Sequence, residues 1–328
     1  MEEVNYILNF DYESSLAGKS FKLKGSNWFD HIFFFINQEA NASLNSTYPF
    51  DEDYLNYLKE LGVVSTKIRR ADNPTNWWGK KIDLPVEKYF NSKITMTELG
   101  LREGWIPVQS TIDIEQARSE FELPLIARDE WGFSGRGVKI IRDERDFDSV
   151  KNRSVFSSYV KKIRDYGITF DLIHDDFFIV ENFIDSRGQF KGGTLRSVDE
   201  SIGEKNLEKL ILIRNKLKDL GATDSVQIDT FTFDKGFHPF VEVNYRRTMG
   251  QMVYSLKRYF DERNIYWLLM TNKKKKSFKD IQEGLKKYPF KTVLLSPADH
   301  FLSIALLSEK ELNISNEISK LEEFIGQI

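Results

Sequence analysis

Oxygen-bearing side chains recur at strand spacing in two neighbouring segments of the sequence. The segment 226–233 carries Asp229, and the segment 240–244 carries Glu242 and Asn244. Both segments alternate in the manner of strands, in which every second side chain points to the same face of a sheet. Two carboxylates and an amide that converge on one face suit a hard cation such as Mg²⁺, which prefers oxygen ligands and leaves positions for water and phosphate.

The register of these two strands decides how the three side chains meet. If residues 234–239 connect the strands, Phe233 opposes Phe240 and Asp229 opposes Asn244, with the second carboxylate beside them. The alternative is a polar patch on a solvent-exposed face. The apolar residues that fill both strands favour a buried, well-packed hairpin instead. The pattern therefore predicts a metal site on this hairpin.

A glycine-rich loop is predicted between two strands within residues 125–141, with glycines at positions 132, 135 and 137. Glycines let backbone N–H groups converge on an anion because no Cβ atom is in the way. The loop is not a Walker loop, because Val138 stands where the lysine after the last glycine belongs. Its spacing also fails the dinucleotide-binding pattern. An ordinary glycine-rich hairpin is the alternative interpretation.

The composition is that of an ordinary globular protein. The chain has 328 residues, 41% of them hydrophobic and 30% charged, with 8 prolines and 19 glycines. This length allows roughly two domains and a substantial core. With 47 basic and 50 acidic residues, the net charge is −3. The basic excess of a general nucleic-acid binder is missing, so we expect no nucleic-acid partner.

Several classes of chemistry lack the residues that they need. The absence of cysteine excludes disulfides, thiolate metal sites and a cysteine nucleophile, and the four histidines are scattered, which disfavours a histidine-rich zinc site. No GxSxG elbow supports a serine hydrolase. No apolar run approaches the roughly 20 residues of a membrane span, and the first residues lack a signal-peptide pattern. We therefore predict a cytoplasmic protein without a membrane partner.

Short periodic segments predict the elements of the first part of the chain and of its last part. Residues 6–10, 31–36 and 63–68 have the composition of strands. Residues 51–62 predict a helix, with leucines at helical spacing and a glycine at the end. We expect these elements to form a first β/α domain around a small sheet. Residues 314–328 carry an apolar stripe and predict a terminal helix that packs on the rest.

The order of the motifs resembles that of the ATP-grasp superfamily, which includes D-alanine:D-alanine ligase and biotin carboxylase. The resemblance spans about Lys93 to Arg246. It rests on these segments: Asn91-Ser92-Lys93-Ile94, Gly104-Trp105-Ile106-Pro107, Ile126-Ala127-Arg128-Asp129 with Gly135-Arg136-Gly137, Val180-Glu181-Asn182-Phe183-Ile184, and Asp229 with Glu242-Val243-Asn244-Tyr245-Arg246.

The resemblance implies an α+β (α/β) architecture, the ATP-grasp fold. In this fold an N-terminal pre-ATP-grasp β/α domain precedes two α+β subdomains that grip ATP between them. We accordingly expect three parts. Residues 1–90 would form the N-terminal domain, residues 91–185 the small subdomain with its glycine-rich lid loop, and residues 186–328 the large subdomain with the metal site.

The resemblance also implies which residues bind the phosphates of ATP. Lys93 matches the first phosphate-binding lysine of the family. Arg128 stands in the place of the second lysine, which is a departure because a planar guanidinium presents its charge differently from a compact ammonium. The lid loop over the β- and γ-phosphates would be formed by Ser134, Gly135, Arg136 and Gly137.

For the nucleoside, the resemblance implies a hinge between the two subdomains that reads adenine. Glu181, Asn182 and Ile184 match this hinge, the last two through backbone groups. The acid that often contacts ribose is replaced by Gly188, and Asp185 is the candidate substitute.

The metal and the reacting groups complete the implied site. Asp229, Glu242 and Asn244 match the magnesium ligands of the family, in agreement with the hairpin pattern, and Arg246 matches an arginine that helps to bind phosphate or the acyl intermediate. We expect ATP and two Mg²⁺ ions, for which Mn²⁺ can substitute. Together with Arg246, Lys93 and Arg128 would neutralise the charge on the transferring phosphoryl group.

The activity implied is that of an ADP-forming carboxylate-amine (or thiol) ligase, which acts through an acylphosphate on an amino acid, a peptide or a small metabolite. Two alternatives stay open: a kinase on the same scaffold, and a nucleotide-binding module with little turnover. Related ligases are commonly dimers, so a homodimer is expected. Candidates for an acceptor pocket, each with a purely structural role as the alternative, are Trp77, Trp78, Lys191, Arg196 and Arg247.

Overall fold

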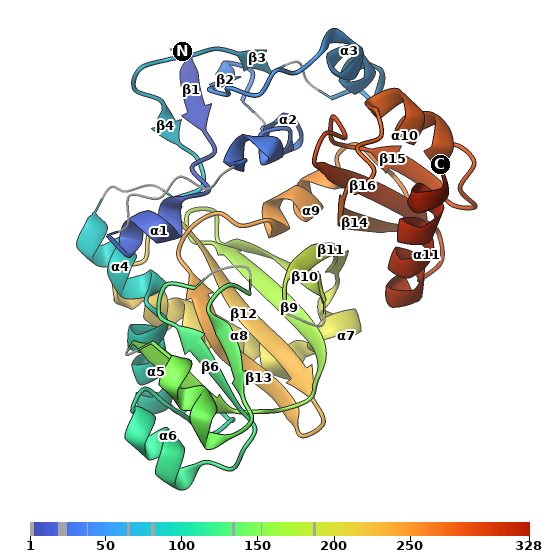
Figure 1. The fold of residues 1–328 in the computed structure, drawn as a ribbon. Helices are drawn as coiled ribbons and strands as arrows, with labels where there is room; N and C mark the ends of the chain where they lie inside the picture. The colour runs from blue at the N-terminus through green and yellow to red at the C-terminus, as the bar shows by residue number, and fades with distance from the viewer. Residues whose placement is uncertain are drawn as a thin grey trace.

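Three sheets follow one another along the chain (Figure 1). The structure, a computed structural model, describes residues 3–18, 25–37, 39–63, 66–79, 83–132, 135–151, 153–185 and 188–328. Among the helices within these ranges, none is long and apolar enough to cross a membrane.

The first sheet has four parallel strands in the order β3-β2-β1-β4. Its strands are β1 (Val4–Ile7), β2 (Ala42–Leu44), β3 (Lys67–Ile68) and β4 (Thr75–Asn76). Parallel neighbours need long crossover connections. The described parts of these connections contain α1 (Tyr12–Leu16), a 3-10 helix (Ser26–Phe29), α2 (Ile32–Ile36) and α3 (Glu52–Glu60). The expected β/α start and the helix predicted over residues 51–62 are therefore confirmed.

The strand predicted over residues 31–36 is wrong, because this segment forms α2. All five residues of α2 are buried. A run that is apolar on every side has no period to separate a buried strand from a buried helix. Of the strands predicted over residues 6–10 and 63–68, the described residues show only the short β1 and β3.

Two helices lead from the first sheet to the second. They are α4 (Leu84–Asn91) and α5 (Lys93–Arg102). Ser92 separates them, and its hydroxyl oxygen accepts a hydrogen bond of 3.2 Å from the backbone N–H of Thr95. A serine in this position satisfies one of the free N–H groups at the start of a helix. The cap therefore fixes where α5 begins, one residue before the lysine predicted to bind phosphate.

The second sheet, here called the small sheet, is antiparallel with the order β5-β8-β6-β7. Its strands are β5 (Ser110–Thr111), β6 (Leu125–Asp129), β7 (Val138–Ile141) and β8 (Ser154–Ser158). It also carries α6 (Ile114–Glu120) and a 3-10 helix (Glu144–Ser149). The glycine-rich loop connects β6 to β7, as the strand-loop-strand pattern predicts.

The third sheet, here called the large sheet, has eight antiparallel strands in the order β13-β12-β9-β10-β11-β14-β16-β15. Its strands are β9 (Lys162–Asp171), β10 (Asp176–Ile184), β11 (Phe190–Arg196), β12 (Ser225–Phe233), β13 (Gly236–Asn244), β14 (Asn264–Thr271), β15 (Lys291–Leu294) and β16 (Phe301–Ser308). The helices of this region are α7 (Val198–Ser201), α8 (Glu204–Asp219), α9 (Gly250–Leu256), α10 (Phe278–Leu285) and α11 (Ile314–Gln327), the last being the predicted terminal helix.

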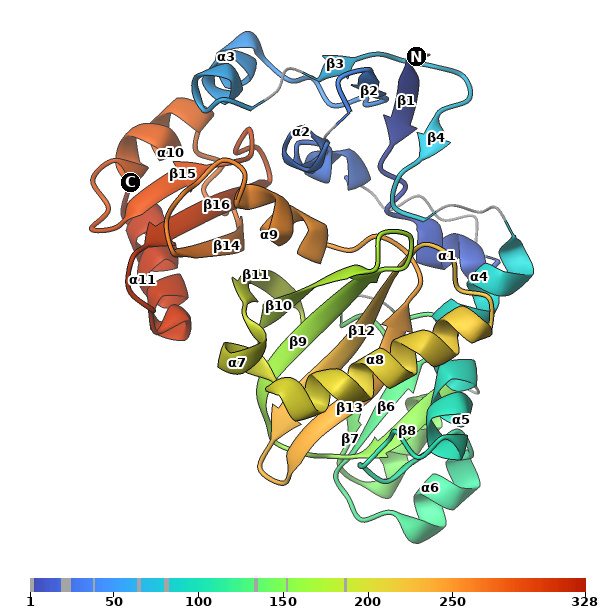
Figure 2. The same cartoon turned by 180° about the vertical axis from the view of Figure 1, so that it is seen from behind.

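The two faces of the large sheet have different neighbours. α8 covers one face of β9, β12 and β13, and the small sheet lies on the opposite side, as the two views show (Figures 1 and 2). The core beneath α8 includes Tyr166 and Ile168 of β9, Ile228 of β12 and Val243 of β13. Side chains of the other parity on the same strands therefore point toward the small sheet.

The expected boundary at residue 185 does not separate two sheets. β10 ends at Ile184, and its antiparallel neighbour β11 begins at Phe190, so the boundary cuts a hairpin of the large sheet. The chain passes from the small sheet to the large sheet at residues 159–161 instead, between β8 and β9. Local composition gives no sign of this change, because strands continue on both sides of it.

Candidate active site

The β12–β13 hairpin holds the three predicted metal ligands on one face. Asp229 lies directly opposite Glu242, and Gln227 lies opposite Asn244. The predicted register, with Asp229 opposite Asn244, is therefore wrong. The prediction assumed a six-residue connection, whereas β13 begins at Gly236 and the pairing shifts register after Asp229. The three side chains still share one face, because directly paired residues and residues two apart along a strand point to the same side of the sheet.

Hydrogen bonds join these side chains. The Asn244 amide donates to Asp229 Oδ2 (3.1 Å), and the Gln227 amide donates to Asp229 Oδ1 (2.6 Å). Burial, and then the neighbouring charge of Glu242, raise the pKa of Asp229 to about 7. No lysine or arginine of the described chain lies within ion-pair distance of the Asp229 carboxylate. A buried carboxylate that receives only amide donors fits a site that a cation completes.

The donor set itself suits magnesium. Within the described ranges, no group of three or more histidine, aspartate and glutamate side chains is arranged to hold a metal. The candidate site therefore depends on two carboxylates, Asp229 and Glu242, with the Asn244 amide as the third oxygen donor. Carboxylate and amide oxygens of this kind fit a hard cation that keeps water and phosphate among its ligands.

Lys93 connects the glycine-rich loop to the hairpin. Its Nζ donates a 2.5 Å hydrogen bond to the backbone oxygen of Gly132 and lies 3.1 Å from Glu242 Oε1. The side chain is only 8% exposed. An ammonium group buried between a loop and a carboxylate is positioned to meet a phosphate group at the same point.

Arg128 reaches the same hairpin from the small sheet. Its Nη1 donates to the backbone oxygen of Val241 (3.0 Å), next to Glu242. Burial lowers the pKa of the Arg128 guanidinium, and the charges of Glu242 and Asp229 act in the opposite direction. The second predicted cation thus lies on the same side of the hairpin as the carboxylates.

The glycine-rich loop adopts backbone conformations that require glycine. Gly135 has φ +75° and Gly137 has φ +79°, in the left-handed region that other residues rarely adopt. A Cβ atom on Gly135 would lie 2.8 Å from the backbone oxygen of Gly188, in the β10–β11 turn. Arg136 lies between these glycines, and the predicted loop residue Ser134 is outside the described ranges. The loop therefore approaches the large sheet closely.

The residues predicted to read adenine lie in β10, inside the large sheet. Glu181 pairs with Tyr166, so its side chain points to the α8 face, away from Asp229. The Glu181 carboxylate contacts Arg196 Nε at 2.6 Å and Arg164 Nε at 3.8 Å. The structure thus does not bring the Glu181 side chain to the other predicted residues, and the segment is not the connection between the subdomains.

The neighbours of Glu181 are placed differently. Asn182 lies opposite Asp165, on the face that also carries Asp229. Ile184 is 42% exposed. Asp185 accepts a hydrogen bond from the backbone N–H of Gln189 (2.9 Å) and lies 3.8 Å from Lys191 Nζ. Asp185 and Ile184 therefore flank the turn that the glycine-rich loop approaches.

Arg246 follows β13 and occupies the end of the site. Its guanidinium lies 2.5 Å from Glu13 Oε1, donates to Asn244 Oδ1 (2.9 Å) and stacks on Trp78, 4.9 Å from the ring centroid. No sequence pattern points to Glu13, because α1 is far away in the chain and no spacing relates it to the motifs.

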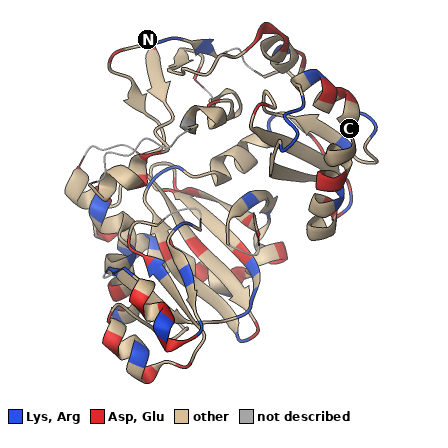
Figure 3. Cartoon of the chain, viewed as in Figure 1, with Lys and Arg blue, Asp and Glu red and all other residues tan. Residues whose placement is uncertain are grey.

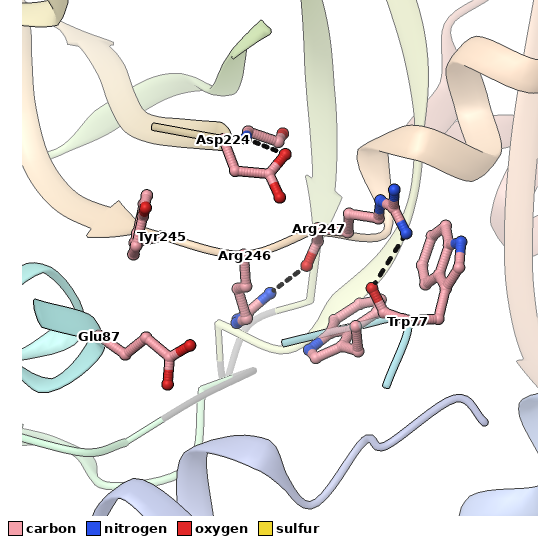
Figure 4. A pocket seen from close by; sticks show the side chains of 8 residues that line it. Trp77, Glu87, Asp224, Tyr245, Arg246 and Arg247 are labelled. Atoms are coloured by element: carbon pink, nitrogen blue, oxygen red, sulfur yellow. Dashed lines mark hydrogen bonds between the residues drawn. The ribbon is translucent and has the colours of Figure 1, made fainter. Parts of the chain in front are cut away.

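Two adjoining hollows meet at Arg246. The first, of about 250 Å³ with open solvent included, is lined by Glu13, Asn91, Lys93, Trp131, Gly132, Glu242, Val243, Asn244 and Arg246. The second, of about 340 Å³, is also lined by Arg246 (Figure 4). Acidic and basic positions are interspersed along the strands around them (Figure 3). The site can therefore present charges of both signs to a ligand.

The sheets and their order define the ATP-grasp fold, as comparison with solved structures shows. N5-carboxyaminoimidazole synthetase from Staphylococcus aureus, complexed with ADP, has 10% sequence identity and a TM-score of 0.62, and the match covers 99% of this chain and 98% of that chain. The synthase from Aspergillus clavatus, in complex with ADP and 5-aminoimidazole ribonucleotide, has 9% identity and a TM-score of 0.61, with 99% of each chain covered.

A biotin carboxylase domain has the same fold. The dimer of this domain from the 2-oxoglutarate carboxylase of Hydrogenobacter thermophilus, complexed with MgADP, ADP and bicarbonate, has 12% identity and a TM-score of 0.52. The match covers 94% of this chain and 86% of that chain. No protein-family model and no curated protein sequence matches the chain. At these identities the likeness establishes the fold, and the chemistry must be argued from the site.

Proposed function

We propose that the chain is an ADP-forming, ATP-dependent ligase that joins a carboxylate to an amine through an acylphosphate. The observation that carries this proposal is the position of Lys93, which contacts both Gly132 of the glycine-rich loop and Glu242 of the hairpin. Transfer of a γ-phosphoryl group needs cations and backbone N–H groups around the phosphate and carboxylates for its metal. The solved neighbours complexed with ADP support the same assignment.

ATP would bind between the small sheet and the large sheet. Its phosphates would meet Lys93, Arg128 and the glycine-rich loop. The hinge that reads adenine in this fold joins the two subdomains, so we assign it to the backbone of residues 159–161 rather than to β10. Asp165, just beyond this connection and on the face of Asp229, is then the candidate acid for ribose. We also propose that residues 159–161 mark the boundary between the small and the large ATP-binding subdomains.

Asp229, Glu242 and Asn244 would hold Mg²⁺. When bound, the metal would neutralise charge on the phosphate oxygens. The MgADP complex of the biotin carboxylase domain supports this choice of metal. Two ions, with Mn²⁺ as a substitute, fit the carboxylate pair.

The reaction would proceed in two steps. A carboxylate oxygen of the first substrate attacks the γ-phosphorus, the bond to the β-phosphate oxygen breaks, and ADP leaves. The amine nitrogen of the second substrate then attacks the acyl carbon, inorganic phosphate leaves, and the nitrogen loses a proton. Arg246, between the two hollows, would neutralise the acylphosphate. Closure of the loop would exclude water, which otherwise hydrolyses such an intermediate.

The first experiment measures the melting temperature of the protein with ATP, in the presence and absence of Mg²⁺. A ligand that binds only the folded state raises its stability. We expect a magnesium-dependent increase that Glu242→Ala abolishes and that the exposed control Glu208→Ala retains. Absence of any increase with the wild-type protein contradicts the proposal.

Release of ADP then separates the remaining classes. A ligase requires both a carboxylate and an amine, whereas a kinase forms a stable phosphorylated product without a second nucleophile. Binding of ATP without ADP release under any of these conditions identifies a nucleotide-binding module.

We also propose a cytoplasmic location, because the reaction consumes ATP. A homodimer is proposed by analogy with the biotin carboxylase domain dimer. Light scattering of the purified chain tests the assembly directly, and a monomer at working concentrations contradicts it.

A further inference from the structure

The hollow of about 340 Å³ that Arg246 also lines is built from three separate parts of the chain. Its lining residues are Trp77, Trp78, Glu87, Asp224, Ser225, Tyr245, Arg246 and Arg247. Figure 4 shows Arg247 beside Trp77, with Asp224 on one side and Glu87 pointing toward Arg246 on the other. Three of the five candidates for an acceptor pocket, the two tryptophans and Arg247, are thereby brought together.

Two of the lining residues, Trp77 and Trp78, hold Arg247 in place. Its backbone N–H donates to the Trp78 oxygen (3.0 Å), and its Nη1 donates to the Trp77 oxygen (3.3 Å). Its guanidinium lies over the Trp77 ring, 4.8 Å from the centroid. Stacking and hydrogen bonding of this kind fix the orientation of a guanidinium before any ligand arrives.

The charge of Arg247 has no counter-ion in the described part of the chain. Its Nε and Nη2 groups donate to none of the described residues, and no described carboxylate lies within ion-pair distance. The adjacent Arg246 is different, since it forms an ion pair with Glu13. A pre-oriented guanidinium with free N–H groups, facing a hollow, is a binding point for an oxyanion.

We propose that Arg247 binds an oxyanion, a carboxylate or a phosphate monoester, that is part of the amine acceptor. This inference rests on the proposed function, because the hollow matters for the reaction only if an acylphosphate forms in the neighbouring hollow, which Arg246 also lines. An acceptor anchored at Arg247 lies beside Arg246, and its amine can approach the acyl carbon from there.

The test uses the full chain with Mg²⁺ and ADP and pairs of amines that differ only in the oxyanion. Amino acids and dipeptides are compared with their amides, and amino-sugar phosphates with the free amino sugars. We expect only the members with an oxyanion to raise the melting temperature. A response to the amino acids or dipeptides identifies the bound oxyanion as a carboxylate, and a response to the amino-sugar phosphates identifies it as a phosphate.

Variants of Arg247 test the assignment for the compound that responds. Arg247→Gln should weaken its binding by about ten- to hundredfold, the usual effect of hydrogen bonds to a charged group, while the response to MgADP alone is retained. Arg247→Lys should restore part of the binding, because it keeps the charge and loses the planar fork. Arg214→Gln serves as the control, because it removes a different arginine that also lies over an aromatic ring, that of Phe170.

Several results would overturn the inference. They are equal responses to both members of a pair, no response to any member with an oxyanion, and unchanged binding in Arg247→Gln. Failure of the proposed function is distinguishable, because the wild-type protein then does not respond to MgADP. In that case the pairs of amines with and without an oxyanion are measured without nucleotide, and the same three results would overturn the assignment of Arg247.

Discussion

Glu13 Oε1 lies 2.5 Å from Arg246 Nε, and this ion pair joins the N-terminal sheet region to the end of the candidate site. Both side chains are at most 10% exposed. The guanidinium is also held by the Asn244 side chain and by the backbone oxygen of Arg247. Glu13, in α1 near the start of the chain, therefore helps to fix the orientation of an arginine that lines both hollows.

Glu13→Gln should lower the free energy of unfolding by about 3 kcal/mol, because it leaves the buried Arg246 cation without its charge partner. Urea denaturation measures this change. The control is Glu3→Gln, which breaks an ion pair with Arg69 at 2.8 Å whose side chains are 32% and 54% exposed. Exposed pairs contribute about 1 kcal/mol or less. Equal effects of the two variants would contradict the role of the buried pair.

Arg128→Lys tests whether the departure from the family's lysine weakens the enzyme. Arg128 Nη1 binds the Val241 oxygen while its charge lies near Glu242 and Asp229. A lysine has no planar fork to make both contacts, so we expect ADP release to fall or stay unchanged. The exposed Arg142→Lys is the control. A large gain in ADP release would instead identify a nucleotide-binding module in which the arginine suppresses turnover.

Local patterns predicted those parts of the site that local geometry determines. Alternation was enough to put Asp229, Glu242 and Asn244 on one face, although the length of the turn and the register shift changed which residues oppose each other. Lys93 was a candidate only through the family resemblance, and the structure places it directly after the Ser92 helix cap.

Contacts between distant segments were not predictable in this way. Glu13 reaches Arg246 only because α1 and the end of β13 meet in the folded chain. Glu181 and its neighbours match the motif of a hinge, but the order of the strands puts this segment inside the large sheet. The strands β14 to β16, which extend the same sheet, had no recognised motif at all.

The buried carboxyl of Asp30 should make stability depend on pH. Burial raises its pKa to about 7, against a weaker opposite effect of its hydrogen bond with the Ser46 hydroxyl. The folded state therefore holds this proton between about pH 4 and pH 7, where the unfolded state has lost it. Stability from this group is present at low pH and is lost as the pH rises toward 7.

Asp30→Asn keeps the shape and removes the titration. The free energy of unfolding of this variant, measured relative to the wild type, should rise between pH 4 and pH 7, by at most about 4 kcal/mol. Taking the difference matters because burial lowers the pKa of the adjacent His31 to about 4, which gives the opposite slope in both proteins. The control is the exposed Asp53→Asn. A difference that does not change with pH would show that Asp30 titrates normally.

The last prediction concerns the close approach of the glycine-rich loop to the large sheet. Gly135→Ala adds a Cβ atom 2.8 Å from the backbone oxygen of Gly188, at a residue with φ +75°. Gly104→Ala is a matched control, because Gly104 has φ +71° and no atom within 4 Å of the added Cβ. Both variants carry the same backbone strain, about 1–2 kcal/mol. Only Gly135→Ala also separates the loop from the β10–β11 turn.

We therefore expect similar melting temperatures for the two variants and a difference in nucleotide binding. Gly135→Ala should weaken ATP binding in the presence of Mg²⁺ by about tenfold, the effect of losing roughly one charge-assisted hydrogen bond between the loop and phosphate. Gly104→Ala should bind ATP as the wild type does. Equal binding by all three proteins would mean that the approach of Gly135 to Gly188 is not needed to hold the nucleotide, and that the loop acts on the phosphates without touching the large sheet.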